Sequence, residues 1–100
     1  MIIHVGALSE LPSEARIIVL VGSRSSDHLR ELARIAEWKG RLAYRIENAG
    51  ELQPRWFSGA EIVGIVVGAA NLQSIVEAVV ARLRYFEGVA KQGMLEGIAR

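Results

Sequence analysis

A stretch of twelve residues, 17–28, combines a run of aliphatic side chains with a polar turn and the start of a helix. Residues 17–21 are all isoleucine, valine or leucine, and Gly22-Ser23-Arg24-Ser25-Ser26-Asp27 follows them. A continuous aliphatic run is typical of a strand buried on both faces, as in parallel sheets that helices cover. The stretch therefore predicts an α/β domain with a strand–turn–helix corner.

A second aliphatic run spans residues 62–67 and leads into a corner of small residues at 68–71. Residues 2–5 and 41–46 predict two shorter strands, and the alternation in the latter favours a position at a sheet edge. Apolar residues recur at offsets of three and four over 27–39 and again over 72–86. Each aliphatic run is therefore followed by a predicted helix.

Polar and glycine residues mark the expected helix ends. Ser26 or Asp27 is expected to cap the first helix, and Gly40 is expected to end it. By the same reasoning, Asn71 caps the second helix and Gly88 ends it.

Two prolines predict shorter helices. Pro12 suits the first turn of a short helix within residues 7–15. Pro54 suits the first turn of another within residues 51–57, which Gly59 closes.

Strands that alternate with helices predict a three-layer α/β/α sandwich with about four mainly parallel strands, of flavodoxin-like type. The two most apolar strands are expected at the centre, next to each other. Their two corners would then lie side by side at the carboxyl edge of the sheet, where open α/β sheets bind ligands. We expect one domain over residues 1–88, with residues 89–100 as a tail or a docked short helix.

Composition excludes several classes of function. The twelve Lys and Arg residues are interleaved with eleven Asp and Glu residues, and the net charge of +1 argues against a nucleic-acid partner. No segment reaches the roughly eighteen apolar residues of a membrane span, and the start lacks the features of a signal peptide, so we expect a cytoplasmic protein without a membrane partner. Without cysteine, the chain can form no disulfide, thiolate nucleophile or cysteine-held metal cluster.

The two corners supply the candidate ligand-binding residues. These are Gly22, Ser23, Arg24, Ser25, Ser26, Gly68, Ala69 and Asn71. Serine hydroxyls, an arginine and the free N–H groups of a helix start suit a phosphate or another anion. The alternative is that Ser25 and Ser26 only cap the helix and that Arg24 pairs with Asp27. His28 lacks a recognisable catalytic partner, so we expect no catalytic residue, no metal ligand and no cofactor.

Several stretches resemble the third domain of hydroxymethylbutenyl diphosphate reductase, of the LytB/IspH family. The resemblance covers roughly residues 15–87. It is carried by Val21-Gly22-Ser23-Arg24-Ser25-Ser26-Asp27, Val63-Gly64-Ile65-Val66-Val67-Gly68-Ala69-Ala70, Gly40–Ile46, Trp56 and the helix Ser74–Leu83. The resemblance implies that the serine loop and the second corner grip a diphosphate, in a three-domain enzyme whose iron–sulfur cluster is held by three cysteines.

The chain departs from this family in ways that bear on function. It has no cysteine and the length of one domain, Asp27 stands where the family has asparagine, and Ala70 stands where it has a ligand serine. We therefore expect a non-catalytic relative that acts as a small binding or interaction module with at most a weak phosphate or anion site. One alternative is a lobe subunit of a split reductase that works with a cysteine-bearing iron–sulfur chain. Another is a free-standing or engineered fold fragment without a ligand.

The expected partners are a phosphate-bearing small molecule and either a second copy or another protein. Tyr85 and Phe86, with the apolar residues of 89–98, offer one candidate surface for a homodimer.

Overall fold

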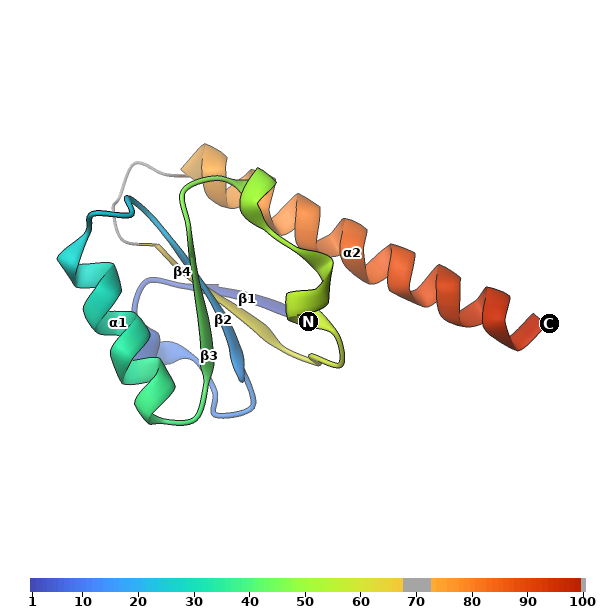
Figure 1. The fold of residues 1–100 in the computed structure, drawn as a ribbon, viewed down its shortest axis with the longest axis horizontal. Coiled ribbons are helices and arrows are strands. Elements are labelled where there is room, and N and C mark those ends of the chain that lie inside the picture. Colours follow the sequence, from blue (N-terminus) through green and yellow to red (C-terminus); the bar gives the residue numbers. More distant parts are fainter. Residues whose placement is uncertain (68–72, 100) are drawn as a thin grey trace.

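The computed structural model describes residues 1–67 and 73–99, with side chains as far as residue 88. Its centre is a four-stranded sheet in the order β1-β4-β2-β3, and every neighbouring pair of strands is parallel (Figure 1). The strands are β1 (Ile2–Val5), β2 (Ile17–Val21), β3 (Leu42–Ile46) and β4 (Val63–Val67). The predicted α/β fold is confirmed, with the two most apolar strands adjacent at the centre.

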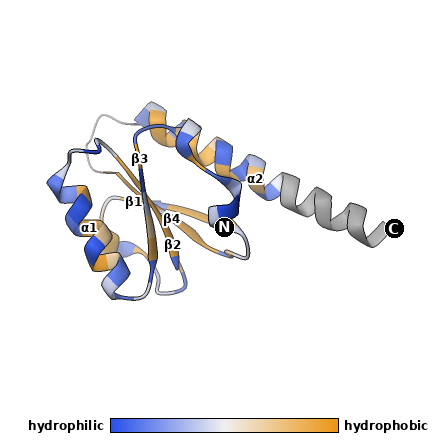
Figure 2. Cartoon of the chain, viewed as in Figure 1, coloured by the Kyte–Doolittle hydropathy of each residue, from blue (hydrophilic) through white to orange (hydrophobic). Residues whose placement is uncertain are grey.

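The alternation of side chains along β2 divides the core into two layers. Ile18 and Leu20 face α1 (Asp27–Trp38) and pack with Leu29 of that helix. Val19 and Val21 face the opposite way, toward the first part of α2 (Gln73–Ala99). All five residues of β2 are buried, which explains the unbroken aliphatic run. Figure 2 shows the hydrophobic strands between the two helices.

The ends of α1 follow the expected capping chemistry. The Oγ of Ser26 accepts a hydrogen bond from the backbone N–H of Leu29 at 3.2 Å, so Ser26 rather than Asp27 is the N-cap. Gly40 has a φ of +80°, a left-handed conformation that glycine adopts without strain, and the chain turns there into β3.

The short helices differ in part from the prediction. The first is η1 (Leu8–Glu10), which ends before Pro12 instead of beginning there. The Glu10 carboxylate accepts the N–H groups of Gly6 and Ala7 at 3.0 and 3.2 Å, which fixes the turn upstream of the proline.

Two more short helices, η2 (Ala49–Glu51) and η3 (Pro54–Phe57), follow β3. Pro54 lies in the first turn of η3, as expected. The turn that follows contains Gly59, which has a φ of +77°.

The second long helix runs further than the sequence suggested. It continues through Gly88 to Ala99, because glycine in a right-handed turn weakens a helix without ending it. Phe86 is 8% exposed and belongs to the core, so it is not free for a homodimer surface, whereas Tyr85 is 58% exposed. Figure 1 shows α2 reaching well beyond the sheet. The predicted cap Asn71 lies outside the described residues.

No helix within residues 1–67 and 73–99 is both long enough and apolar enough to cross a membrane.

Candidate functional site

The first corner begins where β2 lies between β4 and β3. Val21 is paired with Val67 of β4 and with Ile46 of β3, and the N–H of Gly22 donates to the Ile46 carbonyl at 3.0 Å. The corner therefore lies at the carboxyl edge of the sheet, beside the end of β4. The predicted residues of the second corner, Gly68, Ala69 and Asn71, lie outside the described residues.

Three serines of the first corner have two different roles. The Oγ atoms of Ser23 and Ser25 lie 2.9 Å apart, and the N–H of Ser25 donates to the Ser23 Oγ at 3.3 Å. Both side chains are exposed. Ser26 is half-buried and serves as the α1 cap described above. The capping alternative thus holds for Ser26, whereas the Ser25 hydroxyl faces solvent beside that of Ser23.

Arg24 projects from the same corner toward the segment that follows β3. Its Nε donates to Oε1 of Glu47 at 3.0 Å, and its Nη2 pairs with Oε1 of Glu51. The expected alternative, a pair with Asp27, is wrong. The Asp27 carboxylate instead lies 3.7 Å from Nη1 of Arg30, one turn along α1.

Glu51 is held by more than the arginine. Its Oε2 accepts the backbone N–H of Glu47 at 2.6 Å and that of Asn48 at 3.1 Å, so it caps the start of η2. Neither Glu47 nor Glu51 was expected from the sequence. The signal that could have found them was the strand order, because residues after Ile46 must meet residues after Val21 once β3 lies beside β2.

The two histidines lie in different elements at the surface of the molecule. His4 in β1 and His28 in the first turn of α1 are both exposed. In the part of the chain that the structure describes, no three His, Cys, Asp or Glu side chains are grouped so that they could hold a metal ion.

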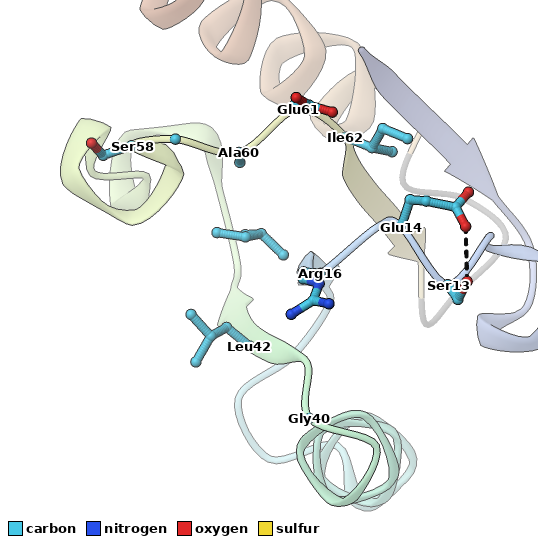
Figure 3. A pocket seen from close by; sticks show the side chains of 11 residues that line it. Ser13, Glu14, Arg16, Gly40, Leu42, Ser58, Ala60, Glu61 and Ile62 are labelled. Atoms are coloured by element: carbon cyan, nitrogen blue, oxygen red, sulfur yellow. Dashed lines mark hydrogen bonds between the residues drawn. The ribbon is translucent and has the colours of Figure 1, made fainter.

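A hollow of about 710 Å³ lies at the opposite, amino edge of the sheet (Figure 3). Ile17 and Leu42 at the starts of β2 and β3 line it, together with Arg16 and the carboxylate-bearing Glu14 and Glu61. The Oγ of Ser13 donates to Oε1 of Glu14 at 2.9 Å on its rim. Sequence reasoning gave no indication of this hollow, and it is separate from the serine corner at the other edge of the sheet.

Comparison with known proteins finds relatives of this chain. A family model described as LytB protein matches residues 5–84. The 4-hydroxy-3-methylbut-2-enyl diphosphate reductases of Salmonella typhi and Salmonella newport strain SL254 are each 36% identical over an alignment 95 residues long, which covers 92% of this chain and 30% of those proteins. The chain thus spans about a third of the length of these curated relatives.

A solved structure gives the same result. It is that of (E)-4-hydroxy-3-methyl-but-2-enyl diphosphate reductase, described as the terminal enzyme of the non-mevalonate pathway. It matches with a TM-score of 0.66 and 36% identity, over 73% of this chain and 26% of that one.

Proposed function

The chain belongs to the LytB family, and on that premise we propose that it is a LytB-type binding module with a weak phosphate site at residues 22–26 and no chemistry of its own. The observation that carries the proposal is the exposed pair of hydroxyls on Ser23 and Ser25 at the start of α1. The relatives are named as reductases of a diphosphate, so a diphosphate is the first ligand class to test.

The chemistry of the corner supports an anion as ligand. A hydroxyl can turn its hydrogen toward a phosphate oxygen, and the first N–H groups of an α-helix have no partner within the helix. The N-terminal end of a helix also carries a partial positive charge. Ser26 uses its Oγ to accept one of these N–H groups, from Leu29, so Ser23 and Ser25 are the proposed hydroxyl donors.

The charges around the corner keep the proposed site weak. Asp27, Glu47 and Glu51 bring three carboxylates to the same edge of the sheet, where Arg24 is the cation within residues 22–26. The sequence also has Ala70 where the family resemblance implies a ligand serine. We therefore propose an affinity in the range in which millimolar phosphate or pyrophosphate is needed for binding.

The iron–sulfur cluster that the family resemblance implies needs cysteine ligands, and this sequence has no cysteine. The residues of this chain do not fit such a cluster, so we assign this chain no step of a reduction.

A second candidate is a lobe that works with a separate, cysteine-bearing LytB chain. The observation that favours it is the match itself, because the chain is 36% identical to one part of its relatives, which is 30% of the curated proteins and 26% of the solved one. Sedimentation velocity with such a chain would test it directly. A complex with one copy of each chain supports the lobe, and separate boundaries at micromolar concentrations contradict it. The same measurement on the protein alone tests self-association.

Thermal unfolding tests the proposed phosphate site. The ligands are inorganic phosphate, pyrophosphate and dimethylallyl diphosphate, each at an ionic strength matched with sodium chloride. A ligand at ten times its Kd adds about 1.4 kcal/mol, which corresponds to several degrees in a domain of this size. Ser25→Ala should reduce the shift in Tm. Ser13→Ala is the matched control, because Ser13 is an exposed serine at the opposite edge of the sheet.

The outcomes of that experiment are distinct. A shift that Ser25→Ala reduces and Ser13→Ala leaves alone supports the site. A shift that both variants keep places the ligand elsewhere on the protein. No shift with any of the three ligands contradicts the proposal and leaves a protein-interaction module or a fold fragment without a ligand.

A further inference from the structure

The Arg24 guanidinium lies between the proposed phosphate site and two carboxylates of its own chain. Arginine has five N–H donors in a planar fork that fits carboxylate and phosphate oxygens equally well. In this structure the fork faces Glu47, through Nε at 3.0 Å, and Glu51, through Nη2. The chain's own carboxylates therefore engage Nε and Nη2, two of the nitrogen atoms through which Arg24 could bind a phosphate.

The two carboxylates differ in how firmly they are held. The Glu51 side chain is 22% exposed, and its second oxygen accepts two backbone N–H groups at the start of η2. The Glu47 side chain is 47% exposed, and the partner of its carboxylate among the described residues is Arg24. Glu47 can therefore turn into solvent without breaking the backbone capping, whereas Glu51 cannot.

From this difference we infer that Glu47 is an intramolecular competitor for the phosphate site: a phosphate that binds Arg24 through Nε displaces the Glu47 carboxylate. This inference rests on the proposed function. Because Glu47 is tethered, it pairs with Arg24 without the loss of translational freedom that a free anion incurs. A singly charged anion that replaces the Glu47 carboxylate gains little binding free energy. Pyrophosphate carries more charge and more acceptor oxygens, so it displaces Glu47 more readily.

Calorimetric titration with pyrophosphate tests the inference. The comparison is between the native protein and Glu47→Gln, with Glu14→Gln as control because it makes the same charge change at the opposite edge of the sheet. Exposed ion pairs are weak, so Glu47→Gln should raise the affinity by about two- to fivefold over the control. The same substitution in an Arg24→Gln background should give no gain. Glu47 is exposed, so the variant is expected to fold, and far-UV circular dichroism checks this.

The other outcomes of this titration would overturn either the competition by Glu47 or the proposed phosphate site. Equal affinities for the native protein and Glu47→Gln overturn the competition and leave the proposed phosphate site standing. A gain that persists in the Arg24→Gln background also overturns it, because Glu47 would then act by general repulsion. Binding by none of the variants, Glu47→Gln included, contradicts the proposed function, and the inference fails with it.

Discussion

The side chain of Leu11 packs directly onto the backbone of Gly64. A Cβ atom at position 64 would lie 2.6 and 2.8 Å from the two Cδ atoms of Leu11, closer than carbon atoms can approach. Gly64 belongs to the central strand β4, where it pairs with Ile3 and Ile18. The absence of a side chain there lets the loop before β2 close over the sheet, and Leu11 is 6% exposed as a result.

We predict that Gly64→Ala lowers the free energy of unfolding by about 1–3 kcal/mol, because the methyl group displaces Leu11 or the strand. Urea denaturation measures the loss. In Leu11→Ala the space above Gly64 is open, so adding Gly64→Ala to that variant should cost much less than it costs alone. Equal costs in both backgrounds would show that Leu11 is not what excludes a side chain from position 64.

Gly88 gives the opposite prediction. It lies within α2, its φ is not in the left-handed region, and no atom lies within 4 Å of where its Cβ would be. Gly88→Ala should therefore raise the free energy of unfolding by about 0.5–1 kcal/mol through helix propensity. A helix that ended there in a left-handed turn would instead be destabilised by alanine, so the sign of the change in Tm tests the continuity of α2.

The fold could be predicted from the sequence because a strand that is buried on both faces needs apolar side chains at successive positions. Ile18 and Leu20 face one layer, and Val19 and Val21 face the other, so the run 17–21 had to be aliphatic throughout. A similar run over residues 62–67 identified β4 as its neighbour. Helix ends were less certain, because glycine permits a stop, as at Gly40, without requiring one, as Gly88 illustrates.

The site was less predictable, because its contacts join loops that are distant in sequence. Arg24 meets Glu47 and Glu51 across more than twenty residues, and a local alternative, Asp27, was equally plausible from spacing alone. The hollow at the amino edge is also assembled from separate segments, residues 13–17, 40–42 and 58–62. Such contacts depend on the direction of individual side chains, which residue patterns do not encode.

Ser25 and Ser26 should differ in how much they contribute to the free energy of unfolding. Ser26 caps α1, so Ser26→Ala should cost about 0.5–2 kcal/mol, whereas Ser26→Asp should retain most of the stability because aspartate is an equally good cap. Ser25→Ala removes an exposed hydroxyl that bonds with Ser23 and should change stability by less than about 0.5 kcal/mol. Chemical denaturation of the three variants checks the order. Equal losses for Ser25→Ala and Ser26→Ala would contradict the assignment of the cap.

The rings of Tyr44 and Trp56 are stacked, with centroids 4.2 Å apart and planes inclined by 6°, so that η3 covers part of the edge strand β3. A double-mutant cycle with Tyr44→Leu and Trp56→Leu should give a coupling of about 0.5–1.5 kcal/mol beyond the loss of buried area. Trp38 is the matched control, because this residue is 86% exposed and Trp38→Leu should change stability by less than about 0.5 kcal/mol. The variants Trp56→Leu and Trp38→Leu also separate the fluorescence of the two tryptophans. Trp56→Leu should leave an emission spectrum typical of a solvated indole, and Trp38→Leu should leave a blue-shifted one. A coupling free energy near zero between Tyr44 and Trp56, with emission spectra of both tryptophan variants that match that of the native protein, would mean that η3 does not pack on β3 in solution.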